Sequence, residues 1–116
     1  LTLLESVQKK SRVLREFVDA LSLSATNVEA SRLEDYAYVA RSPSYDIIVC
    51  RAISLEERSI SPIRRLLKPS GMVVFYKAQK LDDVQNLHYE VLLDKKYPSL
   101  GQRKLIGIKQ RDLMLR

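Results

Sequence analysis

The chain has 116 residues, 46% of them hydrophobic and 29% charged, which excludes a disordered chain and allows at most one ordinary domain. Cys50 is the only cysteine and no apolar run approaches the ~18 residues that span a bilayer, so we expect neither an intrachain disulfide nor membrane contact, and a reducing, cytoplasmic setting fits. The net charge of +6 leaves two alternatives open, a polyanionic partner and a merely soluble basic surface.

The chain begins with a short apolar run, residues 1–5 (LTLLE), that ends in a carboxylate and leads straight into a helix. This helix is predicted over residues 7–22, with Ser6 as its N-cap. An apolar stripe at helical spacing is made of Leu14, Phe17, Val18 and Leu21. Basic residues outside the stripe make the solvent side of the helix positive, and these are Lys9, Lys10, Arg12 and Arg15.

The middle of the chain predicts two more strands and a second helix. Residues 27–31 form a weak, short strand. Tyr45–Arg51 (YDIIVCR) has the unbroken apolar centre that is typical of a strand buried on both faces. A helix is predicted over residues 62–68, because Pro62 at the first helical position loses no needed hydrogen bond, although a start near Leu55 is an alternative.

The last part of the chain predicts three strands and a short helix. Residues 71–77 (GMVVFYK) form a strongly apolar strand, and residues 81–86 are predicted to be helical. Residues 88–93 and 105–109 predict two strands that pair as an antiparallel hairpin with an extended loop over residues 94–104. This order of elements predicts an α/β fold, with a mostly parallel sheet that ends in an antiparallel hairpin.

Several short segments resemble those of known methyltransferases. Residues 66–71 (LLKPSG) are similar to the Leu-Lys-Pro-Gly-Gly turn before the fifth strand of class I S-adenosylmethionine-dependent methyltransferases, with Ser70 in place of the first glycine. More narrowly, further segments resemble the GidB/RsmG family in the right order: residues 1–6 (LTLLES), Lys10, Arg12 and residues 13–15, residues 31–35 (SRLED), residues 50–52 (CRA) and residues 101–105 (GQRKL). The resemblance covers essentially the whole chain and implies a Rossmann-like methyltransferase sheet.

The resemblance also implies an activity, which is S-adenosylmethionine-dependent methylation of guanine N7 in small-subunit (16S) ribosomal RNA. Guanine N7 has a lone pair and carries no proton, so no general base is required and catalysis is mostly alignment of the reacting atoms. We therefore assign no catalytic residue. A metal is not expected either, because His88 has no further ligand residues at a suitable spacing.

The chain departs from the family in one large respect. The first strand of the family, the Gly-rich loop that wraps the methionine part of the cofactor and the helical region before them have no counterpart here. Residues 1–116 are therefore expected to be the C-terminal portion of a class I methyltransferase domain, inactive alone and at best a weak binder of S-adenosylmethionine. Because the absent strand is central in the family, we expect that residues 1–5 shift to pair with residues 45–50, that the chain self-associates, or that it is a proteolytic fragment.

Three residues are candidates for binding the adenosine part of the cofactor. Glu5 ends a predicted parallel strand, where a carboxylate can accept hydrogen bonds from both ribose hydroxyls. Its alternative role is that of an exposed acid that stabilises the next helix N-terminus. The resemblance implies that Leu33 and Glu34 close over the adenine, whereas without it they would be a core residue and a surface acid.

Arg51 ends the apolar strand at the sheet edge where ligands gather, so it could pair with the cofactor carboxylate or with an RNA phosphate. The alternative is an ion pair with Asp46 or Glu56. Candidate RNA-binding residues, each of which could equally be a solvated basic side chain, are Lys77, Arg103, Lys104, Lys9 and Lys10. Two rival functions are a non-enzymatic basic α/β module that binds RNA or protein, and a class I methyltransferase with another substrate.

Overall fold

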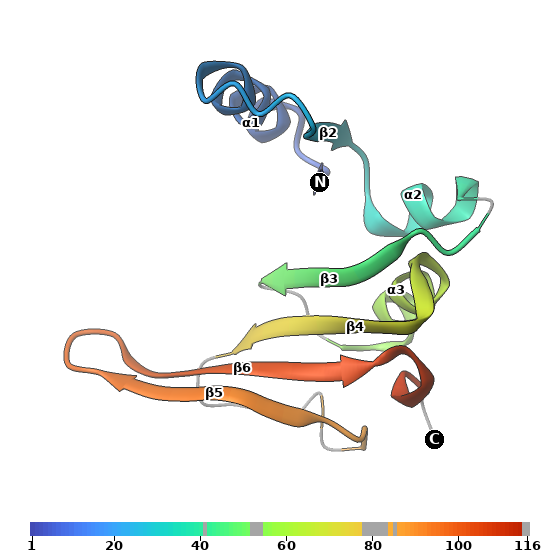
Figure 1. Cartoon of the computed structure of the whole chain (residues 1–116), viewed down its shortest axis with the longest axis vertical. Helices are drawn as coiled ribbons and strands as arrows, with labels where there is room; N and C mark the ends of the chain where they lie inside the picture. The colour runs from blue at the N-terminus through green and yellow to red at the C-terminus, as the bar shows by residue number, and fades with distance from the viewer. Residues whose placement is uncertain (41, 52–54, 78–83, 85, 115–116) are drawn as a thin grey trace. The chain divides into compact units, whose positions relative to one another are not determined.

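The structure is a computed structural model that describes residues 1–40, 42–51, 55–77, 84 and 86–114 (Figure 1). The chain divides into two compact units, Leu1–Val39 and Ala40–Arg116, and each is described by itself. In the described ranges, no helix is long and apolar enough to cross a membrane.

The first unit alternates strands and helices. Its elements are β1 (Thr2–Glu5), α1 (Gln8–Ala20), β2 (Asn27–Ala30) and α2 (Leu33–Val39). The strands β1 and β2 pair in parallel along their whole length, with Glu5 opposite Ala30. The strands predicted over residues 1–5 and 27–31 are therefore confirmed, as is the helix between them.

The predicted cap of α1 is wrong. Val7, in an extended conformation, occupies the N-cap position without a side-chain cap, which leaves Ser6 one residue too early to bond the first helical amides. The Val7 N–H instead donates to Glu5 Oε1 at 3.4 Å. Of the predicted apolar stripe, Leu14 and Val18 are half-buried on the helix that contacts β1 and β2, whereas Phe17 and Leu21 are exposed.

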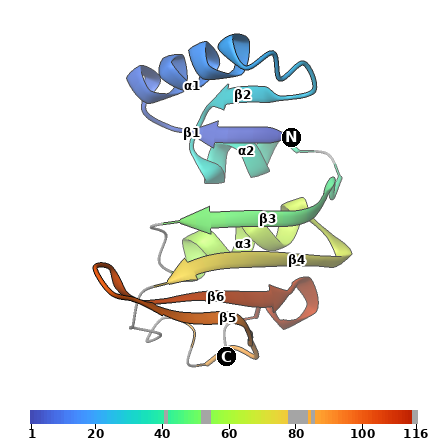
Figure 2. The same ribbon diagram turned by 60° about the vertical axis from the view of Figure 1, so that its left-hand side comes forward.

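The second unit is a four-stranded sheet with a helix and a final 3₁₀ turn. Its elements are β3 (Tyr45–Arg51), α3 (Glu57–Leu66), β4 (Leu67–Lys77), β5 (Glu90–Tyr97), β6 (Gly101–Lys109) and η2 (Gln110–Asp112). The strand order is β3-β4-β6-β5, with β3 parallel to β4 and β6 antiparallel to both of its neighbours (Figure 2). The predicted parallel strands with a C-terminal antiparallel hairpin are confirmed.

The core of this unit lies on one face of the sheet. Phe75 and Val73 of β4 are paired with Ile106 and Ile108 of β6, and all four side chains are buried together with Ile63 of α3. Fully burying a side chain of this size contributes about 1.5–3 kcal/mol. This face therefore supplies most of the stability of the unit.

The strand β3 is not buried on both faces, as its sequence predicts. Cys50 is buried, but Ile47 and Val49 on the other side of the strand are 63% and 72% exposed. An apolar strand sequence does not show which face another layer covers, and here only the face of Cys50 is buried. The expected shift of residues 1–5 to pair with residues 45–50 involves both units and stays a prediction; within its own unit β1 pairs with β2.

The helix α3 begins at Glu57, close to the alternative start near Leu55, rather than at Pro62. A capping box starts it: the Glu56 N–H donates to Ser59 Oγ at 3.1 Å, and the Ser59 N–H donates back to the Glu56 side chain. These two bonds satisfy the backbone amides of Glu56 and Ser59 at the start of the helix.

Directly after α3, residues 68–71 bulge out of β4 opposite the single residue Asp46 of β3. A Cβ on Gly71 would lie 3.0 Å from the carbonyl oxygens of both Asp46 and Lys68. This close approach of backbone explains why the turn needs glycine at this position.

The extended loop predicted over residues 94–104 is wrong. The strands β5 and β6 continue through it to Tyr97 and Gly101, and residues 98–100 alone connect them. Gly101 has a φ of 75°, which is the left-handed conformation that closes a short hairpin of this kind. The helix predicted over residues 81–86 falls largely outside the described residues.

Candidate functional site

Two neighbouring parallel strands of the second unit end at the same edge with a basic residue. Arg51 ends β3 opposite Tyr76, and Lys77 ends β4 one residue further on. The Arg51 guanidinium carbon lies 5.5 Å from the centre of the Tyr76 ring, and Lys77 Nζ lies 5.6 Å from the centre of the Phe75 ring. Both predicted site residues therefore lie at the carboxyl edge of the sheet, Arg51 over Tyr76 on one face and Lys77 over Phe75 on the opposite face.

In the part of the chain that the structure describes, Arg51 forms neither of its alternative ion pairs. Asp46 pairs with Lys68, with Nζ and Oδ1 3.4 Å apart, and Glu56 pairs with Arg58, with Nε and Oε1 2.6 Å apart. Both carboxylates predicted as partners are thus used elsewhere. Among the described residues, the exposed guanidinium of Arg51 has no carboxylate partner.

Cys50, next to Arg51, is a small core residue, as predicted. Burial raises the pKa of its thiol from 9.0 to about 11, and the nearby charge of Lys77 lowers it only partly. The thiol is therefore protonated at neutral pH and is not a nucleophile there. Among the described residues, no three His, Cys, Asp or Glu side chains gather as metal ligands.

The β5–β6 hairpin adds further basic residues to the same edge. Lys104 lies directly opposite Lys77 on β4, and Arg103 lies opposite Lys95 on β5. Lys77 and Lys104 therefore share one face of the sheet, whereas Arg103, the next residue along β6, points to the opposite face. Sequence reasoning missed Lys95 and Tyr97, because proline and glycine in residues 94–104 were interpreted as a long loop.

The remaining candidates lie in the first unit, at the carboxyl edge of the β1–β2 pair. Glu5 ends β1, and its carbonyl oxygen accepts a hydrogen bond from the Ser31 N–H at 3.1 Å, just after β2. Leu33 and Glu34 begin α2 two residues later. Glu5 and Leu33 are half-buried and Glu34 is exposed. The structure therefore places these three residues at one edge.

Lys9 and Lys10 also lie near Glu5. An open hollow of about 390 Å³ is lined by Glu5, Lys9, Lys10, Val13 and Leu14. Two lysines predicted to contact RNA and the acid predicted to bind ribose therefore share one surface. The predicted site residues as a whole form two groups, one in each unit.

Comparisons with known proteins agree on one family. A family model described as GidB, rRNA small subunit methyltransferase G, matches residues 1–113. The protein named ribosomal RNA small subunit methyltransferase G of Polynucleobacter asymbioticus is 33% identical over 88 residues, which are 75% of this chain and 39% of that protein. Its namesake in Gluconobacter oxydans is 38% identical over 79 residues, which are 68% of this chain and 38% of that protein. The chain thus spans well under half the length of these relatives.

Solved structures share the fold at low sequence identity. A putative methylase from Haemophilus influenzae gives a TM-score of 0.61 at 19% identity, covering 91% of this chain and 70% of that one. An rRNA methylase from Streptococcus thermophilus gives 0.65 at 10% identity, covering 93% and 72%. These likenesses show a methyltransferase-like α/β fold. With the family model matched over residues 1–113, the chain belongs to the GidB family of rRNA small subunit methyltransferase G proteins.

Proposed function

We propose that residues 1–116 are the C-terminal portion of a class I methyltransferase domain, and that the intact parent methylates guanine N7 in small-subunit (16S) ribosomal RNA with S-adenosylmethionine as methyl donor. The observation that carries this proposal is the family match over residues 1–113. Because the chain spans well under half of its relatives, the activity is assigned to the parent, and the chain alone is expected to be inactive.

The residues of the first unit fit the adenosine part of the cofactor. The carboxylate of Glu5 is half-buried at a strand end beside an open hollow, which suits an acceptor for two ribose hydroxyls. Leu33 offers a half-buried apolar side chain at the same edge, and Glu34 follows it. In this role Leu33 would cover the adenine face while Glu34 and the local backbone read its edge.

Residues of the second unit fit the charged partners. Arg51 presents an exposed guanidinium that suits the cofactor carboxylate or an RNA phosphate. RNA phosphates would be held by Lys77, Arg103 and Lys104, and in the first unit by Lys9 and Lys10. When bound, S-adenosylmethionine supplies a methyl group that is already activated by the positive sulfur. The protein then has to orient guanine N7 in line with that methyl group, and no residue has to remove a proton.

The decisive experiment uses the intact protein, expressed from its complete reading frame, with unmethylated small-subunit ribosomal RNA and radiolabelled methyl donor. Glu5→Gln should raise the dissociation constant for S-adenosylhomocysteine by about tenfold or more, because a charge-assisted bond to the ribose is lost. Glu16→Gln, which changes an exposed acid of α1, is the matched control and should leave binding unchanged.

Two results would contradict the proposal. One is intact protein that transfers no methyl group to ribosomal RNA, which would favour a non-enzymatic binding module or a methyltransferase with another substrate. The other is Glu5→Gln binding as tightly as the unmodified protein. Calorimetry on the 116-residue chain with S-adenosylhomocysteine tests the expected inactivity separately, since binding at micromolar concentration would overturn it.

A further inference from the structure

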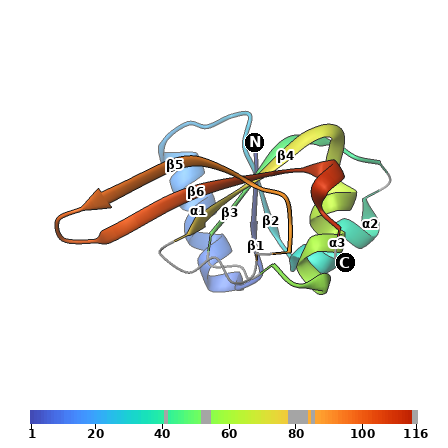
Figure 3. The ribbon, with the colours of Figure 1, turned by 90° about the horizontal axis from the view of Figure 1, so that it is seen from below.

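The β5–β6 hairpin extends beyond the strand on which it packs. The last pair between β4 and β6 is Lys77 with Lys104. Beyond it, Lys95–Arg103, Lys96–Gln102 and Tyr97–Gly101 pair within the hairpin, which protrudes in Figure 3. We call residues 95–103 the hairpin arm. Among the described residues no third strand pairs with the arm, and its side chains are exposed or half-buried, so they can contact a partner.

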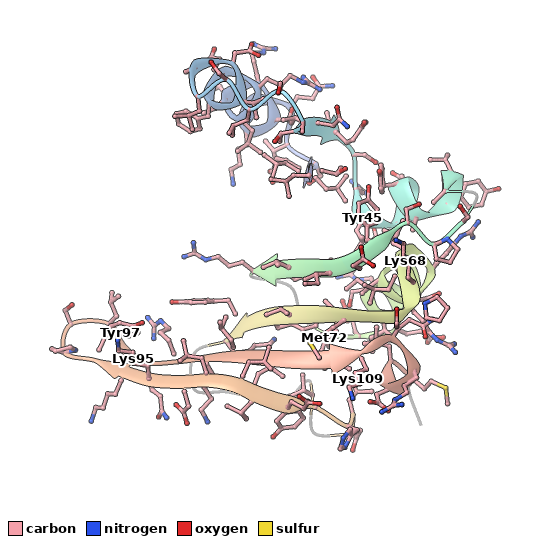
Figure 4. All side chains as sticks on the ribbon, in the orientation of Figure 1. Tyr45, Lys68, Met72, Lys95, Tyr97 and Lys109 are labelled. Atoms are coloured by element: carbon pink, nitrogen blue, oxygen red, sulfur yellow. The ribbon has the colours of Figure 1, made fainter. Side chains whose placement is uncertain are left out.

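One face of the arm combines basic and aromatic side chains. Lys95 and Arg103 are directly opposite each other and therefore point to the same face, and Tyr97, two residues from Lys95, shares it. Lys95 Nζ lies 5.2 Å from the centre of the Tyr97 ring, and Figure 4 shows the two side chains next to each other near the arm tip. The same face continues along β6 to Leu105, which is opposite Tyr76 of β4. There Arg51 of β3 lies over the Tyr76 ring. Along β6 the two tyrosines are separated by about 13 Å, at ~3.3 Å per residue.

The arm keeps this positive charge at a cost to its own stability. Like charges directly opposite each other in a strand pair are destabilising, and Lys95–Arg103 in the arm is such a pair. Within the described part of the chain, Lys95 and Arg103 form no ion pair. Asp94 lies opposite Lys104, just outside the arm, and accepts a hydrogen bond from Gln102 Nε2 at 2.6 Å. A bound polyanion would remove this repulsion.

We propose that this face of the hairpin arm, with Lys95, Tyr97 and Arg103, binds the backbone and bases of unpaired RNA. The inference rests on the proposed function for the RNA substrate and adds a docking element that lies beyond the strand ends. Phosphates would lie against Lys95 and Arg103, and a base would stack on the half-buried Tyr97 ring. An acidic protein partner would use only the positive charges of the arm. A nucleic acid would use the positive charges for its phosphates and the aromatic ring for a base, so this combination favours nucleic acid.

The test measures binding of fluorescein-labelled, single-stranded oligouridine to the 116-residue chain by anisotropy at several salt concentrations. The double variant Lys95→Gln/Arg103→Gln should bind about tenfold or more weakly and should lower the log–log salt slope by about 1.4, for two lost phosphate contacts on a single strand. Tyr97→Leu should weaken binding by about fivefold or more with an unchanged slope, because stacking and not charge is lost.

The matched control is Lys109→Gln/Arg111→Gln, which removes the same charge at the opposite end of β6 and should change affinity by less than about twofold. Equal loss in both double variants would overturn the proposal, since net charge alone would then explain binding. Binding of polyglutamate as tight as that of oligouridine, unaffected by Tyr97→Leu, would also overturn it in favour of an acidic protein partner.

Stability and activity separate the remaining outcomes. The double variant of the arm should melt at the same or a higher temperature than the unmodified chain, because it relieves repulsion, so weaker binding would not reflect unfolding. In the intact protein it should raise KM for ribosomal RNA and leave the affinity for S-adenosylhomocysteine unchanged. Methylation without any effect of the arm variants would refute the arm alone, whereas RNA binding through the arm without methylation would refute the proposed function alone.

Discussion

The two units of the chain differ in how their folds are held together. In Leu1–Val39 the buried side chains are Ser11 and Ala37, whereas Ala40–Arg116 buries large apolar side chains from α3, β4 and β6. A two-stranded sheet is marginally stable by itself, and segments below about 40 residues rarely fold unaided. The difference teaches that the adenosine-binding candidates lie in the weakly stabilised unit, whereas the candidate RNA-binding residues Lys77, Arg103 and Lys104 lie in the stable one.

The largest expected difference between the units is in amide hydrogen exchange. Amides of β4 and β6 should exchange only when the second unit unfolds, while those of β1 and β2 should exchange through local opening. We expect protection at least about 10³-fold higher in β4 and β6, measured by nuclear magnetic resonance or mass spectrometry. Similar protection in both units would show that the first is stabilised by more than its own contacts.

The two phenylalanines of the chain offer a matched test, because Phe75 is 1% exposed and Phe17 is 58% exposed. Phe75→Ala should lower the free energy of unfolding by about 3–5 kcal/mol, through lost burial and a residual cavity. Phe17→Ala should lower it by less than about 1 kcal/mol. Urea denaturation followed by circular dichroism measures both, and Phe75→Leu provides a milder variant if Phe75→Ala does not fold. Equal effects would contradict the contrast between the units.

A smaller effect is expected at the bulge that starts β4. Gly71→Ala should destabilise the second unit by about 1–3 kcal/mol, because the new methyl group meets two backbone carbonyls that cannot move independently. Ser70→Ala, at the neighbouring exposed position, is the control and should change stability by no more than about 0.5 kcal/mol. If Gly71→Ala left the stability of the second unit unchanged, the backbone of the bulge would have to shift to accommodate the methyl group.

The smallest effect concerns the pH dependence of the second unit. The pKa of the buried Cys50 thiol is raised to about 11, above its ordinary value of 9.0, so the stability linked to it is fully present below about pH 9 and is lost as pH rises through 11. Between these values the free energy of unfolding should fall by at most about 1.4 kcal/mol per pH unit. Urea denaturation at a series of pH values measures this fall, and Cys50→Ala should not show it. An equal fall with pH in both proteins would count against a buried thiol.

Part of the candidate site could be predicted from sequence because it depends on strand direction alone. Residues that end parallel strands lie at one edge, so Arg51 and Lys77 end at the same edge of their sheet, as do Glu5 and the segment that carries Leu33 and Glu34 in theirs. Which face each side chain takes depends on the register, and Arg51 and Lys77 lie on opposite faces. The position of Lys95 opposite Arg103 could not be predicted from the sequence, because it depends on the register of the hairpin. A three-residue connection closed by Gly101 sets that register, and composition does not distinguish it from a long loop.

The sequence by itself determined the order of strands and helices, the family and the chemistry offered at the strand ends, because these follow from local periodicity and short motifs. Only the tertiary structure decided which apolar faces are covered. The strand β3 has the composition of a fully buried strand, yet Ile47 and Val49 are exposed, since burial depends on elements that are remote in sequence. The start of α3 at a capping box and the length of the hairpin arm were likewise decided by hydrogen bonds and cross-strand pairs, which local composition does not encode.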